Sequence, residues 1–268
     1  MSSEQFIFQF RGHSINVAPG DYRWYWEAFQ RDGVEPESYD VYDRYVTSVT
    51  TFLDVGAWTG PVTLYVANKA QKVYAFEPDP TAFGELENNL KLNPQLTNVK
   101  IIRAFVGTSE GVIKMGNASQ RGNSQSSVLF RDGGDSWQAD SIKLDRFIAE
   151  NEMTSDLFIK MDIEGAEYTL LPTLKSLFLE RKPTLLLSLH PFFLIATVPG
   201  KGLLAKIRKS LKLLTNSIRL IKSLERFPFI YDLKGRKVNL WLNLPKVLIA
   251  KPLVYDNIVV ATYKNLGD

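Results

Sequence analysis

The chain has 268 residues, of which 45% are hydrophobic and 12% aromatic, so it can form a sizeable core and is not expected to be disordered. Its formal net charge is only +3, which gives no reason to expect a nucleic-acid partner. It has no cysteine and two histidines, which excludes disulfides, thiolate catalysis, cysteine-ligated zinc and a histidine-rich metal site.

Residues 1–48 are expected to form an N-terminal segment that covers the main domain. Apolar residues over 6–10 and 15–17 predict a small hairpin, and residues 39–49 predict a helix that leads into a sheet. The aromatic cluster between them is Tyr22, Trp24, Tyr25, Trp26 and Phe29. We expect it to pack against the domain, with a substrate-facing role as the alternative. The segment does not begin with a basic stretch followed by an apolar core, so it predicts a cytoplasmic protein without a secretory signal.

Residues 51–61 predict a buried strand, a turn through two glycines and the start of a helix. This unit is typical of the nucleotide site of an open α/β sheet. The spacing of Gly56 and Gly60 is not that of a dinucleotide site, and Trp58 stands where a pyrophosphate needs bare backbone. The carboxylate of Asp54, at the end of the strand, opposes a phosphate and favours a cation. The pattern therefore favours S-adenosylmethionine, which carries a sulfonium and an amino group but no phosphate, over a nicotinamide cofactor.

The second predicted strand, residues 72–76, ends at Glu77. This residue lies roughly 20 positions past the first glycine, where such sheets place the acid that binds the ribose hydroxyls. A helix is predicted over 81–92 and a third strand over 99–105, and an adenine ring would stack at the end of that strand.

Residues 108–140 interrupt the alternation of strands and helices. They are rich in glycine, serine, asparagine and glutamine, and they predict a hairpin and loops. Binding residues concentrate on such loops, so we expect this region to cover the ligand edge, with surface decoration as an equal alternative. A short helix is predicted over 144–150.

The fourth predicted strand, residues 157–162, ends in a cluster of carboxylates. Asp162 ends the strand, and Glu164 and Glu167 open the next helix. Acidic residues are favoured in the first turn of any helix, which is the alternative explanation of the two glutamates. Asp162 ends an apolar strand, so we expect it to point into the cleft.

The fifth predicted strand, residues 184–189, ends at His190. Because strands one, four and five are neighbours in a doubly wound sheet, we expect Asp54, Asp162 and His190 to converge. A single histidine after a strand is often structural, but this one lies at the ligand edge. A neutral imidazole near pH 7 is a suitable general base.

The last third of the chain contains a basic amphipathic stretch. The uncharged region between Lys182 and Lys201 is interrupted by three prolines and a histidine, so we expect no transmembrane helix there. Residues 200–226 predict a helix that caps the sheet, or a lid whose basic face meets an anionic substrate or an anionic membrane surface. Further strands are predicted over 229–233, 237–241 and 257–263.

Three stretches together resemble the FkbM-type S-adenosylmethionine-dependent methyltransferases, namely residues 52–60, 74–80 and 160–167. The resemblance implies an α/β fold with the seven-stranded, mostly parallel class I methyltransferase sheet and helices on both faces. It implies O-methylation of a hydroxyl on a sugar, a glycan or a related small molecule. The order and spacing of the family's motifs hold over about residues 50–192, and we expect the cofactor-binding domain to extend over 49–268 with a helical insertion at about 200–226. The chain departs from the family at Trp58, where asparagine is usual.

The resemblance further implies the residues of the site. By this resemblance Asp54, Gly56, Gly60 and Glu77 would bind the cofactor, and from the layout of the strand ends we also expect Ala57, Trp58, Pro78, Phe105, Val106 and Asp162 at the cofactor. Those expected at the catalytic edge are Lys160, Asp162, Glu164 and His190, with Glu167 beside them. Either His190 or Asp162 would take the proton of the acceptor hydroxyl.

Three further expectations concern metals and partners. We expect no bound metal, with Mg²⁺ or Ca²⁺ held by the carboxylates as the less favoured possibility. We expect a hydroxylated acceptor and no nucleic acid as partners, and the oligomeric state is left open. The alternative functions are a non-catalytic binding module with the same fold and, less favoured, a nicotinamide-dependent oxidoreductase.

Overall fold

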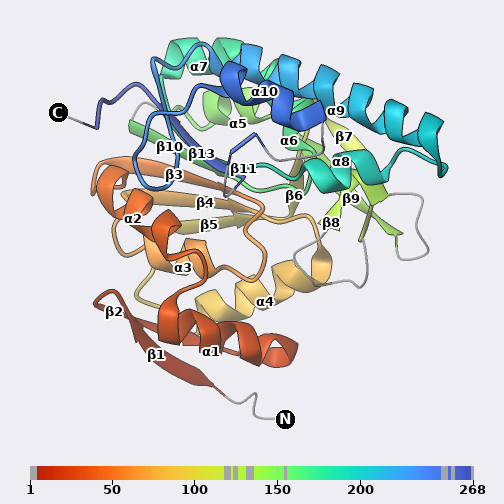
Figure 1. Ribbon diagram of the computed structural model, residues 1–268. Helices are drawn as coiled ribbons and strands as arrows, with labels where there is room; N and C mark the ends of the chain where they lie inside the picture. Colours follow the sequence, from red (N-terminus) through yellow and green to blue (C-terminus); the bar gives the residue numbers. More distant parts are fainter. Residues whose placement is uncertain are drawn as a thin grey trace.

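The computed structural model describes residues 5–117, 122, 126–130, 136–153, 156–248, 253–254 and 257–266. Its centre is a seven-stranded sheet with the strand order β12-β13-β11-β10-β3-β4-β5 (Figure 1). The strands are β3 Thr50–Val55, β4 Lys72–Phe76, β5 Val99–Ile102, β10 Asp156–Met161, β11 Thr184–Ser188, β12 Phe229–Tyr231 and β13 Ile258–Thr262. All neighbours pair in parallel except β13, which runs antiparallel to β11 and β12. The expected α/β fold with a mostly parallel sheet is confirmed.

Helices cover both faces of this sheet, as expected (Figure 1). Those on one face are α2 Pro36–Tyr45, α3 Pro61–Val66 and α4 Pro80–Lys91. Those on the other face are α5 Leu144–Glu150, α6 Glu167–Leu170, α7 Lys175–Arg181, α9 Leu203–Leu224 and α10 Leu240–Leu248. Every side chain of β3 and β11 is buried, so apolar surface is needed above and below the strands.

The N-terminal segment packs on the main sheet. β1 (Phe6–Phe10) and β2 (His13–Val17) form the expected antiparallel hairpin, and a short turn of helix, η1 (Gly20–Tyr22), leads to α1 (Arg23–Asp32). Trp26 and Phe29 are almost fully buried, in a core that includes strands of the central sheet. For these two aromatic residues the packing expectation holds.

Residues 104–142 add a second, smaller sheet in the order β6-β9-β7-β8. Its strands are β6 Ala104–Val106, β7 Gly111–Asn117, β8 Ser126–Ser127 and β9 Ser136–Ile142, and η2 Val128–Phe130 follows β8. β7 and β9 form the hairpin that the sequence predicts, but the rest of the expected loops partly lie outside the described residues. The single strand predicted over 99–105 is wrong, because the chain leaves the central sheet at Arg103 and β6 pairs with β9.

The C-terminal third departs from prediction at one element. A strand was expected over 237–241, but α10 begins at Leu240. The Oδ1 atom of Asn239 accepts the backbone N–H groups of Trp241 at 3.0 Å and Leu242 at 3.2 Å, as an asparagine N-cap does. The hydrogen bonds of this cap favour a helix here more strongly than the apolar residues favour a strand. η3 (Leu171–Thr173) and α8 (Pro191–Ala196) complete the list of elements.

The basic stretch forms one long helix, α9. Its buried residues are concentrated after Lys212, where Leu213, Leu220, Ile221 and Leu224 join the main core. This half of the helix is the cap on the sheet that the sequence favours. Among the helices of the described residues, none is long and apolar enough to cross a membrane.

Candidate active site

A cavity of about 600 Å³ opens where the strands of the central sheet end. Gly56 and Ala57 after β3, Glu77 after β4 and His190 after β11 form its floor and one wall. The opposite wall comes from the N-terminal segment, through Tyr22, Trp24, Tyr25, Glu35 and Tyr39. The carboxyl ends of parallel strands are where open α/β sheets place their ligands. Tyr22, Trp24 and Tyr25 of the N-terminal aromatic cluster therefore line this cavity, which agrees with the alternative prediction that part of the cluster faces a substrate.

Most of the residues predicted for the site lie around this cavity. Those among its lining residues are Gly56, Ala57, Trp58, Glu77, Pro78, Phe105, Lys160, Asp162, Glu164 and His190. Three predicted cofactor residues, Asp54, Gly60 and Val106, are not among them. The sheet thus brings the strand ends together as expected, but these three residues do not line the cavity.

The turn after β3 is held in one conformation by close packing. Gly56 has φ +86°, and a Cβ atom there would lie 1.9 Å from the backbone oxygen of Asp162. Gly60, with φ +95°, is the N-cap of α3, and Pro61 follows at the first helical position. The glycines therefore serve the close approach of β3 to β10 and the entry into α3.

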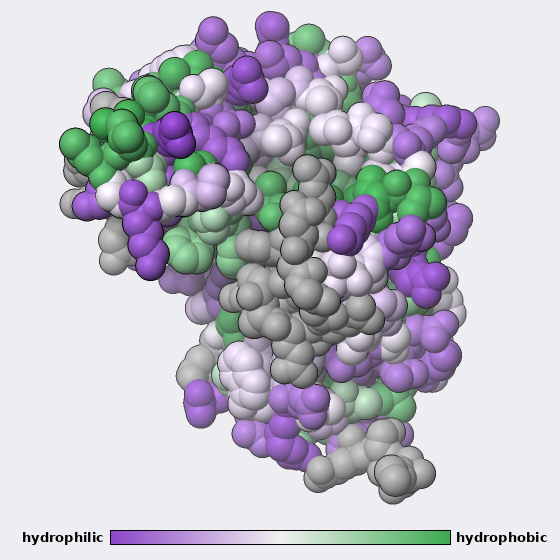
Figure 2. Space-filling view, turned by 90° about the vertical axis from the view of Figure 1, so that its right-hand side faces the viewer, coloured by the Kyte–Doolittle hydropathy of each residue, from purple (hydrophilic) through white to green (hydrophobic). Residues whose placement is uncertain are grey.

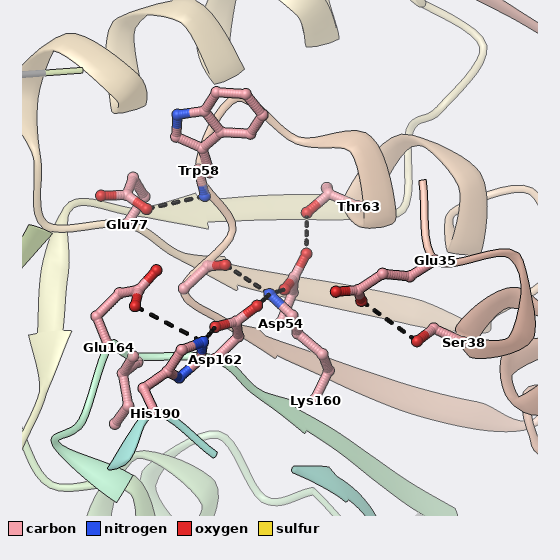
Figure 3. A network of polar contacts seen from close by, with 12 residues as sticks. Glu35, Ser38, Asp54, Trp58, Thr63, Glu77, Lys160, Asp162, Glu164 and His190 are labelled. Carbon is pink, nitrogen blue, oxygen red and sulfur yellow. Dashed lines mark hydrogen bonds and ion pairs between the residues drawn. The ribbon is translucent and has the colours of Figure 1, made fainter. Parts of the chain in front are cut away.

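Trp58 points away from the acidic cluster and is held at several points (Figure 3). Its backbone N–H donates to Glu77 Oε2 at 2.8 Å, and its indole Nε1–H donates to the backbone oxygen of Gly122 at 2.7 Å. The rings of Tyr22 and Tyr25 meet the indole edge to face at 4.9 and 4.8 Å between centroids. Trp58 is therefore part of the cavity wall and does not fill the cavity.

The region after β6 reaches the site, as expected for a segment that covers the ligand edge. Gly122 also donates its backbone N–H to Asp79 Oδ2 at 3.0 Å, so it joins the turn after β3 to the start of α4. Met115 of β7 and Phe105 of β6 line the cavity. These two side chains supply apolar surface beside the polar strand ends.

Glu77 is buried and its carboxylate is already ordered. Oε2 accepts the backbone N–H of Trp58 and Oε1 accepts that of Asp79, both at 2.8 Å. Burial raises the pKa of Glu77 to about 7, against the opposing effect of these two backbone N–H groups. Each oxygen keeps a lone pair that can accept a further hydrogen bond from a ligand. A direct contact of Glu77 with a ribose stays a prediction.

Asp54 is fully buried and has partners inside the protein (Figure 3). Its Oδ2 accepts the Thr63 hydroxyl at 2.6 Å, and its Oδ1 lies 3.2 Å from the Nζ of Lys160. Lys160 Nζ also donates to the backbone oxygen of Gly56 at 2.6 Å. The cation that faces Asp54 here is thus the ammonium of Lys160, and a direct contact of Asp54 with a cofactor stays a prediction.

Lys160 is itself 7% exposed and remains charged. Burial alone lowers the pKa of its ammonium, but the carboxylates of Asp54 and Asp162 outweigh this effect and raise the pKa above its ordinary value. Asp162 Oδ2 lies 4.0 Å from Lys160 Nζ. Lys160 therefore connects the buried Asp54 to Asp162 at the cavity surface.

His190 lies among three carboxylates. Its Nδ1 is 3.0 Å from Glu167 Oε1, while its Nε2 is 3.4 Å from Asp162 Oδ1 and 3.6 Å from Glu164 Oε2. Burial alone lowers the pKa of His190, but the hydrogen bond to Glu167 and the charges of Asp162 and Glu164 raise it to about 10. The expectation of a neutral imidazole near pH 7 is corrected, because the ring is an imidazolium in this arrangement.

The same cluster bears on the metal question. One ligand atom from each of Asp162, Glu164 and His190 lies within 4.8 Å of the others, a spacing that a divalent cation could bridge. Burial raises the pKa of Glu164, and the His190 cation opposes that rise. The positive charge of His190 neutralises part of this cluster and so competes with a metal ion for the carboxylates. The expectation of no bound metal stays a prediction.

Sequence reasoning missed polar residues of the site, among them Glu35 and Thr63. Glu35 is the N-cap of α2 and lines the cavity (Figure 3). Its carboxylate accepts a hydrogen bond from the Ser38 hydroxyl at 3.5 Å. Burial raises the pKa of Glu35. The hydroxyl of Thr63, in α3, donates a hydrogen bond to the buried carboxylate of Asp54. A glutamate before Pro36 reads as a helix start, and Thr63 as an ordinary helix residue, so neither carried a local signal.

His190→Gln is expected to change how stability depends on pH. The pKa of His190 is about 10 in the folded protein and roughly 6.5 in an unfolded chain. Its contribution is therefore fully present below about pH 6.5 and is lost as the pH rises through about 10. We expect the variant to lose on the order of 2–4 kcal/mol of unfolding free energy near neutral pH and almost none above about pH 10.5, by urea unfolding.

The matched control for this experiment is His13→Gln, which removes the other histidine, in the hairpin. Any change in stability that comes only from the loss of an imidazole should appear in this variant as well. Parallel stability curves for His190→Gln and the unaltered protein would contradict the charged state assigned to His190.

Comparisons with known proteins identify a family model and several similar structures. The family model described as "Methyltransferase FkbM domain" matches residues 54–200, more than half of the chain. Among solved structures, the chain is similar to the methyltransferase FkbM of Methylobacillus flagellatus, with 21% identity, 53% of this chain and 33% of that chain covered, and a TM-score of 0.40. The similarity thus spans about a third of the length of that protein.

Two further structures are similar at the same level. One is an rRNA methylase of Streptococcus thermophilus, with 14% identity, 56% of this chain and 67% of that chain covered, and a TM-score of 0.34. The other is a Streptococcus mutans protein in complex with SAH, with 15% identity, 56% and 68% covered, and a TM-score of 0.33. No curated protein matches the sequence.

Proposed function

Because the chain belongs to the FkbM methyltransferase family, we propose that it transfers a methyl group from S-adenosylmethionine to a hydroxyl of a sugar, a glycan or a related small molecule. The observation that supports this most is the cavity of about 600 Å³ at the strand ends. It joins the glycine turn and Glu77, which suit a nucleoside, to the carboxylates and histidine after β10 and β11, which suit a proton transfer. A cofactor and an acceptor can therefore meet in one space.

The lining residues fit the proposed cofactor. Glu77 offers lone pairs for ribose hydroxyls, and Phe105 and Met115 offer apolar surface for an adenine. Asp162, whose side chain is 34% exposed, offers a carboxylate to the positively charged end of the cofactor or to the acceptor. When bound, S-adenosylmethionine supplies a methyl group that is already activated by the sulfonium.

The protein's own contribution is to orient the acceptor and to accept its proton. A hydroxyl is a weak nucleophile until it is deprotonated, and the correct alignment of two reactants can lower a barrier by several kcal/mol. Asp162 is the proton acceptor that we favour, because it is at the cavity surface and His190 is already protonated. The Nε2–H of His190 points toward Asp162 and Glu164, where it can hold the acceptor oxygen and offset negative charge.

Calorimetric titration with S-adenosylmethionine tests the cofactor assignment. The unaltered protein should bind it, and Glu77→Gln should bind at least about 10-fold more weakly, since a neutral amide is a poorer acceptor for two ribose hydroxyls. Glu87→Gln, which removes a carboxylate on the exposed side of α4, is the matched control and should bind as the unaltered protein does. A protein that is folded but gives no heat with the cofactor would end the proposal.

Asp162→Asn is expected to lower kcat by about 10²–10⁴-fold, since loss of a general base acts on the chemical step. The measurement is single-turnover transfer of an isotope-labelled methyl group, after extracts of glycans and small molecules have been screened for acceptors by mass spectrometry. Asp145→Asn, at an exposed position of α5, is the control. An unchanged rate in Asp162→Asn would contradict its role as the base.

Two additions to the same assay address the remaining alternatives. Activity that survives a chelator such as EDTA would agree with the expectation of no metal, and activity that is lost and then restored by Mg²⁺ or Ca²⁺ would contradict it. Turnover with any acceptor would exclude a non-catalytic binding module.

A further inference from the structure

The N-terminal half of α9 exposes large apolar side chains to solvent. Leu203 is 74% exposed, Leu204 72%, Ile207 45% and Leu211 56%. In the same half of the helix only Ala205 is buried, whereas the C-terminal half packs into the core. Figure 1 shows the start of α9 extending beyond the sheet, in cyan. These four residues are called the α9 apolar face below.

The four residues of the α9 apolar face lie next to one another on one side of the helix. With 3.6 residues per turn, positions 203, 204, 207 and 211 fall within an arc of about 100° on the helix surface. α8 contacts α9, and it adds Phe192, which is 70% exposed. Figure 2 shows a group of hydrophobic side chains on this end of the molecule, at the upper left, with hydrophilic ones around it. Such exposed apolar patches mark surfaces of contact.

Basic residues border this face on both sides. They are Lys201, Lys206, Arg208, Lys209 and Lys212, and the sequence has no acidic residue between Glu180 and Glu225. Lys206 and Arg208 flank the apolar arc on its two edges, at about 60° and 40° from it. Among the described residues none of the five forms an ion pair with an acidic side chain. Their charge is available to an anionic partner.

We propose that the α9 apolar face and Phe192 dock on an anionic lipid surface, with α9 lying in the plane of the interface. An exposed apolar stripe bordered by lysine and arginine is the arrangement of interfacial helices, whose apolar side enters the acyl boundary while the basic side chains meet anionic head groups. A second copy of this chain fits less well, because a two-fold contact through the same face would bring its basic borders together. A nucleic acid would use the basic residues but not the leucines.

Vesicle flotation tests the proposal with the full chain. At about 0.1 M salt we expect the protein to float with vesicles of phosphatidylcholine containing about 30% phosphatidylglycerol and to remain behind with phosphatidylcholine alone. Leu203→Ser/Leu204→Ser should lower vesicle partitioning by about 100-fold, because two leucines no longer enter the interface. Lys206→Glu/Arg208→Glu/Lys209→Glu should abolish binding to the anionic vesicles.

The matched control is Ile7→Ser/Val112→Ser, which removes two residues that are 61% and 64% exposed on other elements. It should float as the unaltered protein does, and thermal unfolding should show that all variants remain folded. Three results would overturn the proposal: no flotation with anionic vesicles, equal flotation of the leucine variant, or equal flotation of the charge-reversal variant. Self-association that disappears in the leucine variant, without vesicle binding, would assign the face to a second copy.

Discussion

Gly56→Ala is expected to give a protein that has lost about 4 kcal/mol or more of unfolding free energy, or that does not fold. The new Cβ would lie 1.9 Å from the backbone oxygen of Asp162, and φ at this position is +86°, where an L side chain is strained. Backbone cannot swing aside as a flexible side chain can. β3 and β10 would have to separate at the point where both enter the cavity, so cofactor binding should be lost even where some protein folds.

Gly84→Ala is the matched control for this substitution. Gly84 lies inside α4, and a Cβ atom there would meet no heavy atom within 4 Å. We therefore expect Gly84→Ala to raise stability by about 0.5–1 kcal/mol, through the better helix propensity of alanine. Urea unfolding and titration with S-adenosylmethionine measure both variants. A Gly56→Ala protein with normal stability and normal cofactor binding would show that the turn is wrongly described.

Lys160→Met is expected to cost about 3–5 kcal/mol of unfolding free energy, because it leaves Asp54 buried without its cation. Asp54 is 0% exposed and its Oδ1 lies 3.2 Å from Lys160 Nζ. The change also removes the donor to the backbone oxygen of Gly56, which that ammonium contacts at 2.6 Å. We expect weaker cofactor binding as a second consequence, since the turn after β3 loses a support.

The double variant Asp54→Asn/Lys160→Met tests the cause. Removing the carboxylate charge together with the ammonium should recover a large part of the lost stability, because no unpaired charge remains buried. Lys264→Met is the control for removing a lysine from an exposed pair. Its ammonium lies 2.8 Å from Asp156 Oδ2 at the surface, and we expect a loss of only about 0–1 kcal/mol. If the double variant were as unstable as Lys160→Met, the pairing with Asp54 would not explain the effect.

The chemistry-bearing positions could be read from the sequence because local patterns define strand ends. Each of Asp54, Glu77, Asp162 and His190 follows or ends an apolar run that the structure shows as a strand of the central sheet. Parallel strands joined by helices place such ends on one edge, so their gathering follows from the order of elements alone. The family resemblance added the seven-stranded class I methyltransferase sheet and the expected methyl-transfer activity.

Local hydrophobic patterns gave the wrong secondary structure in two places. In one, a helix cap decided the structure, and in the other, pairing with a strand far along the chain decided it. The residues at 237–241 favour a strand, yet the side chain of Asn239 caps a helix that begins at Leu240. The apolar run at 99–105 looks like one strand, yet its second half pairs with β9, which lies more than 30 residues further along the chain. In both cases the spacing of hydrophobic residues does not show which groups will hydrogen-bond to the backbone.

The sequence by itself determined the fold class, the strand-end residues and the family. Only the tertiary structure decided the charge states within the site. The register of β3 and β10 sets Lys160 opposite Asp54, so that carboxylate is neutralised from within the protein. The packing of α6 against the end of β11 places Glu167 beside His190, which makes the expected base a cation. Register and packing depend on contacts between residues far apart in the chain, and the protonation of a buried group depends on its nearest charges, so no local pattern contains either.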